Sequence, residues 1–541
     1  MCPMTNEVDA IVVGAGFAGL YMLHNLREKG LSAKLIEAGK DVGGAWYWNR
    51  YPGLRCDVES TDYQYQFSDE IERGWDWPER YSKGPVIQNY LSYVADTLDL
   101  RRDILFETTA TAATFEEDRQ SWLVETDRGG TFRASYFILA VGPLTSVNTP
   151  PFAGMEEFKG RLFHTARWPE DPVDFTGRRV GIIGTGSSGV QSIPVIGQEA
   201  ASLTVFQRTP AFSLPAENRA LSADEIRQKH GQFARDREVR RASSGGLSWM
   251  LSTRSALEVS DEEREAEFER CWTLGGFAFI QSFRDILLSQ EANDLAADFI
   301  KRKIRAKVND PETAAVLTSQ AYPFGAKRPC LDTNYYETFN LPHVQLVDLR
   351  KAPLERFCAE GIVAGGAVHA FDDIVLATGF DAVTGAVLKL KITGKGGLSL
   401  GDVWSSGPQT YLGIAIAGFP NLFMIDGAQS PSIIVNAPLA IEQQVEWVGD
   451  CIEQMRRNGY TTIEASEPAQ QEWVAHVGEV ANYTLMVNAD SWAMGANIPG
   501  KPRVFSFYLA GLDAYRNRCA AVAEGGYEGF RLEKAMGAVA A

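Results

Sequence analysis

Short apolar runs that close on glycine recur along the chain. Two of them, residues 9–13 and 179–183, lead directly into a glycine-rich turn and then into a stretch with apolar residues at helical spacing. A further apolar run follows each unit, at 33–36 and at 203–206. A buried strand, a tight turn, an amphipathic helix and a second strand are typical of a βαβ unit in a parallel sheet. We therefore predict an α/β fold with two Rossmann-like domains.

The two turns share one glycine spacing, G-x-G-x-x-G, which suits a dinucleotide. The first glycine allows the tight turn, and the backbone N–H groups at the helix start bind the pyrophosphate. The first turn contains Gly14, Gly16, Phe17 and Gly19, and the second contains Gly184, Thr185, Gly186, Ser187, Ser188 and Gly189. One such turn is weak evidence, but here strand, spacing and following strand agree twice.

The two copies differ where the ribose binds. The first copy has Glu37, eighteen residues after Gly19, and a carboxylate there binds the two hydroxyls of an adenosine ribose. The second copy has Gln207 at the matching position, followed by Arg208 and Thr209. A cation and a hydroxyl favour a 2′-phosphate, which a carboxylate repels. We predict FAD at the first site, NADPH at the second, and electron transfer between them.

The order of the segments predicts one domain inserted into the other. Two more apolar runs, 137–141 and 373–378, close on Gly142 and Gly379 and flank the second unit. Residues 220–324 are charged and helix-like, with a capping box at Ser260-x-x-Glu263. The predicted parts are the FAD domain at 1–142 and 373–541, the NADPH domain at 143–219 and 325–372, and a helical insertion at 220–324.

Composition narrows the class of protein. A chain of 541 residues with 45% hydrophobic and 22% charged residues holds several globular cores, and no apolar run approaches the roughly 18 residues that span a bilayer. The 52 basic and 69 acidic residues give a net charge of −17, which disfavours nucleic acid and anionic membranes. The basic run 301–307 has Phe299, Ile300 and Ile304 at helical spacing, so we expect a solvated helix face.

Cysteine and histidine usage bears on location and metals. The seven cysteines form no C-x-x-C pair, and the six histidines are dispersed. We therefore expect a cytoplasmic protein without a bound metal, since the amino terminus also shows no signal-peptide pattern. No dimer motif is present, so the oligomeric state stays open and a monomer is compatible with the sequence.

Two longer patterns resemble a known family. Residues 158–169, with Phe158, Gly160, His164, Trp168 and Pro169, match F-x-G-x-x-x-H-x-x-x-W-P, the signature of type I Baeyer–Villiger monooxygenases. The segment 43–57 also resembles a pattern of that family, and the similarity continues through 493–501 and 526–530. The resemblance implies two nucleotide domains, FAD and NADPH, and a reaction in which one oxygen atom of O2 is inserted beside a ketone carbonyl. The product is an ester or a lactone, and the other oxygen atom leaves as water.

In that family, the resemblance implies, a flavin C4a-peroxide attacks the ketone and gives a Criegee intermediate. The peroxide must be an anion to act as a nucleophile. Arg328 matches the family's catalytic arginine, whose charge lowers the pKa of the peroxide and stabilises the oxyanion. Asp57 matches the carboxylate that orients this guanidinium. From composition alone, Arg328 would more often be a surface charge and Asp57 a turn residue.

The resemblance also implies further cofactor contacts. Gly44, Trp46, Trp48, Tyr63, Ala110 and Asp57 would lie against FAD, and Lys327 and Arg328 would join Arg208 and Thr209 at NADPH. Trp492 lies in a segment near 488–504 that matches a mobile loop folding over NADP. His164 would lie in the interdomain connection and couple domain movement to turnover, or would be a structural histidine.

The segment 427–437 would line the ketone pocket, and its length is similar to phenylacetone and steroid monooxygenases rather than cyclohexanone monooxygenases. We expect Ser432, Ile433, Ile434 and Ala437 to face a bulky aryl or polycyclic ketone, since the small Ala437 enlarges the pocket. Two alternatives stay open. One is a flavin enzyme that oxidises nitrogen or sulfur, and the other is a non-catalytic NADPH-sensing scaffold.

Overall fold

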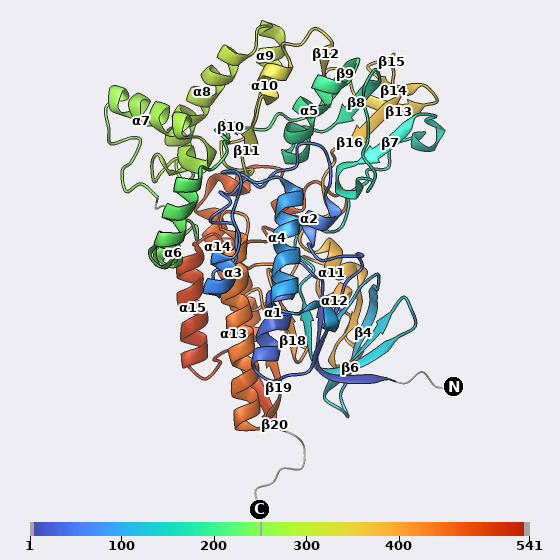
Figure 1. The fold of residues 1–541 in the computed structure, drawn as a ribbon, viewed down its shortest axis with the longest axis vertical. Helices are drawn as coiled ribbons and strands as arrows, with labels where there is room; N and C mark the ends of the chain where they lie inside the picture. Colours follow the sequence, from blue (N-terminus) through green and yellow to red (C-terminus); the bar gives the residue numbers. More distant parts are fainter. Residues whose placement is uncertain (1–4, 249–250, 535–541) are drawn as a thin grey trace, which may run out of the picture.

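The computed structural model describes residues 5–248 and 251–534, and its lower half in Figure 1 is organised around an eight-stranded sheet. The strand order is β17-β4-β5-β6-β1-β2-β3, and β18 pairs with β6. The bounds are β1 Asn6–Val13, β2 Ala33–Ile36, β3 Ile104–Leu105, β4 Ala110–Glu116, β5 Ser121–Thr126, β6 Thr131–Leu139, β17 Lys391–Thr393 and β18 Leu422–Met424. Strands β6, β1, β2 and β3 are parallel, and helix α1, Phe17–Glu28, connects β1 to β2.

A second sheet of five parallel strands lies in the upper half of Figure 1. Its order is β12-β9-β8-β16-β7, and helix α5, Ser187–Glu199, connects β8 to β9. The bounds are β7 Arg161–His164, β8 Arg179–Ile183, β9 Ser202–Gln207, β12 Val344–Asp348 and β16 Asp373–Leu376. The trio β16-β8-β9 repeats the trio β6-β1-β2 of the first sheet, so the predicted α/β fold with two Rossmann-like units is confirmed.

The second sheet corrects one expected boundary. Strand β16 pairs on one side with β8, through Asp373 and Val180, and on the other with β7, through Asp373 and Arg161. Residues 373–376 therefore complete the second sheet, whereas the sequence placed the return to the first domain at 373. Asp373 is fully buried and binds both Arg161 and Arg178, which fixes the start of this strand.

The expected helical insertion contains helices α6 Ala223–Ala242, α7 Asp261–Leu274, α8 Gln290–Lys307 and α9 Pro311–Leu317, which extend along the left side to the top of Figure 1. The capping box at Ser260 and Glu263 is confirmed. Helix α8 buries Phe299, Ile300 and Ile304 and directs Arg302 and Lys303 to carboxylates of α7, so the basic run is indeed an amphipathic helix.

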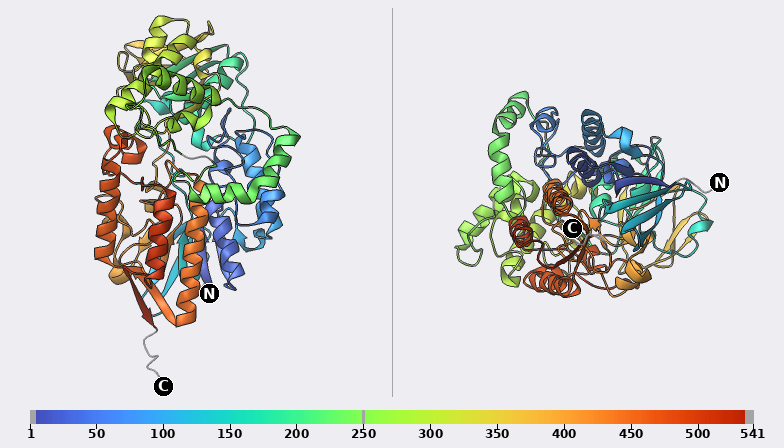
Figure 2. Two further views of the ribbon diagram at one scale, coloured as in Figure 1. Left: turned by 90° about the vertical axis from the view of Figure 1, so that its left-hand side faces the viewer. Right: turned by 90° about the horizontal axis from the view of Figure 1, so that it is seen from below.

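In the C-terminal part, helix α13, Ala437–Asn458, packs against α1, and α15, Leu512–Glu524, packs against α13 (Figure 2). This part also contains α14 Glu467–Asn482 and the hairpin of β19 Tyr460–Ala465 and β20 Phe530–Lys534. The shorter elements are α2 Ala45–Trp48, α3 Asp69–Arg73, α4 Gly84–Thr97, α10 Tyr335–Thr338, α11 Gly385–Lys389, α12 Leu400–Val403, β10 Ser213–Pro215, β11 Cys330–Asp332, β13 Leu354–Cys358, β14 Gly361–Ala364 and β15 Ala367–Ala370. Among the described helices, none is long and apolar enough to cross a bilayer.

Candidate active site

A cavity of about 1550 Å³ reaches both glycine-rich turns. It exceeds the roughly 300–1,000 Å³ of a pocket for one small ligand, as two dinucleotides require. The predicted residues that line it are Gly14, Gly16, Phe17, Glu37, Gly44, Trp46, Trp48, Asp57, Tyr63, Ala110, Gly184, Thr185, Gly186, Ser187, Ser188, Arg208, Thr209, Lys327, Arg328, Ser432, Ile433, Ala437 and Trp492. The structure thus brings together most residues that the sequence proposed for the two cofactors.

Both glycine turns are built in the same way. A Cβ on Gly14, whose φ is +103°, would lie 2.5 Å from the carbonyl oxygen of Ala140, and one on Gly184, with φ +109°, would lie 2.5 Å from that of Ala377. Only glycine fits such positions without strain. Gly19 and Gly189 do not line the cavity, because they pack the helices α1 and α5 against the preceding turns.

The N-termini of α1 and α5 are suited to binding anionic groups. Each helix follows a glycine, Gly16 or Gly186, and no side chain caps either N-terminus. The free N–H groups of the first turn and the helix dipole favour a phosphate at both places. The residues present therefore fit the pyrophosphate groups of two dinucleotides.

Glu37 is held in place for a ribose. It follows β2, is 4% exposed, and accepts hydrogen bonds from the backbone N–H groups of Ala15 (2.7 Å) and Gly39 (2.6 Å). Burial raises the pKa of this carboxyl above its usual range, although the two N–H donors counteract the rise. Hydroxyl donors of a ribose would complete its hydrogen bonding, which fits FAD at the first turn.

Aromatic residues cover the first part of the cavity. The indole Nε1 of Trp46 donates to the hydroxyl of Tyr63 at 3.2 Å, and the two rings meet edge to face with centroids 5.6 Å apart. The guanidinium of Arg167 lies 4.7 Å from the ring centre of Trp48. These contacts fix both tryptophans, so they form a rigid wall for a planar ligand.

The second ribose position carries two cations. Arg208 and Thr209 follow β9 and are exposed toward the cavity, and the Lys327 ammonium lies 4.8 Å from the ring centre of Tyr322. Burial lowers the pKa of Lys327, and the charge of Arg208 lowers it further, so the two cations are close together. Across residues 5–248 and 251–534, no ion pair involves Arg208 or Lys327. A phosphate would neutralise both, which fits the 2′-phosphate of NADPH.

Arg328 and Asp57 form a two-point ion pair in the cavity wall. Arg328 Nε donates to Asp57 Oδ2 at 2.7 Å, and Nη2 donates to Oδ1 at 2.9 Å. Nη1 donates to the carbonyl oxygen of Ile433 at 2.6 Å, and the guanidinium stacks 4.7 Å from the ring centre of Phe277. Burial acts against the charge, but the attraction of Asp57 outweighs it and raises the pKa of Arg328. The cation is therefore permanent and fixed in direction.

The segment carrying Asp57 is fastened to the second domain. The hydroxyl of Tyr51 donates to Gln191 Oε1 in α5 at 2.8 Å, and Gln191 Nε2 donates to the carbonyl oxygen of Arg55 at 3.1 Å. A Cβ on Gly53 would lie 2.1 Å from the Gln191 carbonyl oxygen. This close approach places Asp57 beside both nucleotide sites.

The segment predicted to line the ketone pocket lies only partly on the cavity. Ser432, Ile433 and Ala437 line the cavity, but Ile434 is 38% exposed and lies outside it. Of the two isoleucines, Ile433 is the one turned inward, at 4% exposure. The sequence did not show which of the two adjacent isoleucines faces the site.

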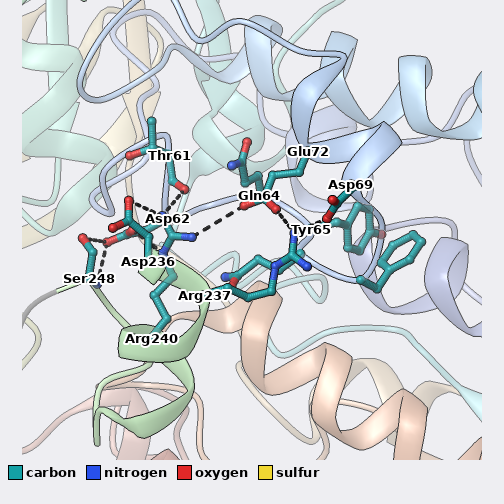
Figure 3. Close-up of polar contacts among 12 residues, drawn as sticks. Thr61, Asp62, Gln64, Tyr65, Asp69, Glu72, Asp236, Arg237, Arg240 and Ser248 are labelled. Atoms are coloured by element: carbon teal, nitrogen blue, oxygen red, sulfur yellow. Dashed lines mark hydrogen bonds and ion pairs between the residues drawn. The ribbon is translucent and has the colours of Figure 1, made fainter. Parts of the chain in front are cut away.

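A buried ionic cluster supports this wall from behind (Figure 3). Arg240 of α6 is 0% exposed, and it donates to Asp62 Oδ1 at 2.7 Å and to the Thr61 carbonyl oxygen at 2.9 Å. Asp62 also accepts from Ser248, and its carbonyl oxygen accepts from Asn436 Nδ2 at 2.7 Å. Asn436 directly precedes Ala437, so the helical insertion is connected to the pocket wall. The sequence analysis missed Arg240, Asp62 and Asn436.

His164 lies at the end of β7, outside the cavity lining. Its Nδ1 accepts from the Ala166 N–H at 3.0 Å, so Nε2 carries the hydrogen and faces the Asn148 carbonyl oxygen and the Thr378 hydroxyl, both at 3.0 Å. Burial lowers the pKa of His164, so the ring is neutral at pH 7. Asn148 and Thr378 do line the cavity, and His164 holds the two interdomain segments together.

The segment near 488–504 lies against the cavity. Trp492 lines it and packs edge to face on Phe507, with ring centroids 5.5 Å apart. Lys501 Nζ binds Asp381 Oδ1 at 2.6 Å, and Asn497 Nδ2 donates to the Phe380 carbonyl oxygen at 2.7 Å. These contacts hold the segment beside the strand end that closes the second sheet.

Comparisons with known proteins identify the family. A sequence model described as flavin-binding monooxygenase-like matches residues 8–216. The chain is 43% identical over 525 residues to a Baeyer–Villiger monooxygenase of Pseudooceanicola batsensis, covering 96% of this chain and 95% of the relative. It is 42% identical over 529 residues to the phenazine N-monooxygenase PhzNO1 of Lysobacter antibioticus, covering 97% of each.

Solved structures of related enzymes superpose on nearly the full length of this chain. An oxidised steroid monooxygenase bound to NADP superposes with a TM-score of 0.94 at 47% identity, covering 98% of this chain and 100% of that one. A complex of OTEMO with FAD and NADP gives a TM-score of 0.94 at 39% identity, with the same coverage. Full-length identity of this order shows that the chain belongs to the type I Baeyer–Villiger monooxygenases, which use FAD and NADPH to convert ketones into esters or lactones.

Proposed function

We propose that Arg328, held by Asp57, is the catalytic cation of this ketone monooxygenase. The overall reaction takes a ketone, O2, NADPH and a proton to an ester or lactone, NADP⁺ and water. Bound FAD, once reduced by NADPH, supplies the oxygen activation. The chain itself has to hold both nucleotides, limit access of water and stabilise negative charge next to the ketone.

The geometry of Arg328 carries this proposal. Its three hydrogen bonds and the ring of Phe277 fix the guanidinium in the wall of the cavity that both glycine turns share. A fixed cation there lowers the energy of an oxyanion that develops on the ketone oxygen, and it needs no rearrangement during the reaction. Asp57 maintains the direction of the guanidinium by accepting two of its N–H groups.

The other residues bind and orient. We assign Glu37 to the ribose of FAD, Arg208, Thr209 and Lys327 to the 2′-phosphate of NADPH, and Trp492 to the cover over NADPH. The buried carboxylate of Glu37 and the two neighbouring cations Arg208 and Lys327 support these assignments. His164 is assigned to the connection between the domains, because it bonds Asn148 and Thr378 and does not reach the cavity.

A bulky ketone is the proposed substrate class. The small side chain of Ala437 and the inward-facing Ile433 leave an apolar part of the cavity beside Arg328. The 47% identity to a steroid monooxygenase structure supports this size class. The test incubates purified protein with NADPH, air and a panel of aryl, polycyclic and small cyclic ketones. Products sixteen mass units heavier, formed fastest from the bulky ketones, are expected, and a preference for small ring ketones would contradict the size assignment.

Oxidation of nitrogen is the second candidate. The 42% identity to a phenazine N-monooxygenase favours including aromatic N-heterocycles in the panel. An oxidant acting on a nitrogen lone pair is an electrophile, and a fixed cation that stabilises negative charge favours the ketone reaction instead. Oxygen transfer confined to heterocycles and sulfides would reverse the order of the two candidates.

We also propose a reducing, cytoplasmic location. Cys56, Cys271, Cys330, Cys358, Cys451 and Cys519, the cysteines among the described residues, are all buried and unpaired, which supports a protein that does not depend on disulfides. Cys2 lies outside the described residues.

A further inference from the structure

Asp426 is a half-buried carboxylic acid on the cavity wall that the reaction described above does not use. It follows β18 directly and lines the cavity together with Tyr63 and Ser432. Its Oδ1 is shielded from solvent and has no hydrogen-bond partner within the described part of the chain. No cation of that part forms an ion pair with it either. A shielded carboxyl oxygen without a partner is costly unless a ligand completes its hydrogen bonds.

The sheet places Asp426 relative to the nucleotide. Strand β18 pairs with β6, β6 pairs with β1, and the N–H of Ile425 bonds to the Leu139 carbonyl oxygen at 2.9 Å. Asp426 therefore lies two strands from Gly14 along the same carboxyl edge, about 10 Å at ~4.8 Å per strand. Glu37, at the end of β2, lies on the other side of Gly14.

This order matches the order of groups in FAD. The adenosine ribose belongs to Glu37 and the pyrophosphate to the turn at Gly14, so the next group along the edge is the ribityl chain with its hydroxyls. We propose that Asp426 is a further FAD-binding residue, whose carboxyl group hydrogen bonds with a ribityl hydroxyl. The inference rests on the assignment of the first glycine turn to FAD.

The backbone and the protonation state agree with this role. Asp426 has a φ of +56°, and its N–H donates to Gln444 Oε1 of α13 at 2.6 Å, so the residue is held firmly in an unusual conformation. Burial raises the pKa of Asp426 to about 7, and the Ser432 hydroxyl limits the rise. Near neutral pH the carboxyl can keep its proton, so it both donates to and accepts from a hydroxyl.

The test measures release of FAD from the holoenzyme. Diluted protein is followed by the fluorescence of free flavin, which gives the dissociation constant without turnover. We expect Asp426→Ala to weaken FAD about tenfold, the scale of one buried hydrogen bond left unmade. Asp426→Asn keeps a donor and an acceptor of the same shape, so its dissociation constant should stay within about threefold of wild type.

Two further variants separate the possible failures. Glu442→Gln changes another buried carboxyl, whose pKa is raised to about 8 but which bonds the backbone of Gln66 and Phe67 away from the cavity, so FAD should bind it normally. Glu37→Gln should weaken FAD if the first turn binds it. If Glu37→Gln binds FAD weakly and Asp426→Ala binds it normally, the inference about Asp426 is overturned and the assignment of the first turn to FAD stands. If both variants bind FAD normally, the assignment of the turn is overturned as well.

Two further outcomes of the experiment would contradict the proposal, and the first concerns binding of the ketone. If Asp426→Ala binds FAD normally and raises only the KM for ketones, the carboxyl faces the substrate and the proposal is wrong. If Asp426→Asn loses as much FAD affinity as Asp426→Ala, a neutral hydrogen bond to the ribityl chain is excluded. Thermal unfolding of each variant is measured in parallel, since a variant that is unfolded would release FAD whatever the role of the substituted residue.

Discussion

Replacing Arg328 with alanine removes the fixed cation and leaves the rest of both nucleotide sites in place. The guanidinium contacts Asp57, Ile433 and Phe277, and none of these belongs to either glycine turn. We therefore expect FAD to remain bound and the reduction of FAD by NADPH to proceed at nearly the wild-type rate.

The magnitude follows from the position of the charge. An oxyanion about 4 Å from a cation gains roughly 4 kcal/mol at an effective dielectric constant of about 20. Removal of one preorganised donor from an oxyanion site costs about 10²–10³ in kcat, or about 2.7–4 kcal/mol. The side chain of Arg328 is 25% exposed, so solvent screens part of the interaction and the lower end of this range is expected. Ester formation should fall about 10²-fold.

The assay separates the two half-reactions. Anaerobic mixing with NADPH gives the rate of FAD reduction from its absorbance, and the amount of ester per NADPH consumed gives the oxygen transfer. Arg328→Lys keeps a charge but loses the two-point contact with Asp57, so it should recover only part of the activity. Arg208→Gln is the matched control, because it removes an arginine from the same cavity on the NADPH side. Ester formation by Arg328→Ala at the wild-type rate, or an equal loss in both half-reactions, would refute the catalytic role.

Four further predictions test the remaining parts. Arg208→Gln should raise the KM for NADPH about tenfold or more with little effect on NADH, since it removes a partner of the 2′-phosphate, and equal changes for the two nucleotides would contradict the assignment. Ala437→Met should lower kcat/KM for polycyclic ketones more than for small ring ketones, because it fills the apolar side of the cavity, and competing ketone pairs measure the ratio. Burial lowers the pKa of His164, so the folded protein resists its protonation. As the pH drops below about 6.5, the free energy of unfolding should therefore decrease more steeply in the wild type than in His164→Gln. Urea unfolding between pH 5 and 8 measures this difference. Arg240→Met should lower Tm by removing the cation that pairs with the buried Asp62, whereas combining it with Asp62→Asn should restore part of the loss. An unchanged Tm would show that the cluster in Figure 3 does not fasten α6.

Local features were predicted well from the sequence because they depend on short-range chemistry. The strands at 33–36 and 179–183 have the bounds that their apolar runs suggested, and Ser260 and Glu263 form the expected capping box. In each case the deciding residues are within a few positions of one another. The helical spacing around Ile300 and Ile304 was sufficient to predict helix α8 for the same reason.

Features that depend on pairing between distant segments were not predicted from the residues alone. The strand at 373–376 was recognised, but its sheet became clear only from its pairing with β7 and β8. The choice between Ile433 and Ile434 depended on how one turn sits against Arg328. Burial, which raises the pKa of Asp426, is likewise a property of the assembled cavity. A pattern did exist for Asp426, since an acid follows the apolar run 422–425 just as Glu37 follows 33–36.

The environment of Arg328 shows why the site needs the whole fold. Its guanidinium joins three segments of the chain, since Asp57 precedes it by 271 residues and Ile433 follows it by 105. Asp57 is fastened to α5 through Gln191, and Ile433 belongs to the wall that Asn436 connects to the ionic cluster around Arg240. A shift of either nucleotide domain would therefore turn the guanidinium as well as the cofactor sites. Because the value of a preorganised charge depends on its direction, oxygen transfer should be more sensitive than cofactor binding to substitutions at Gln191 and Asn436.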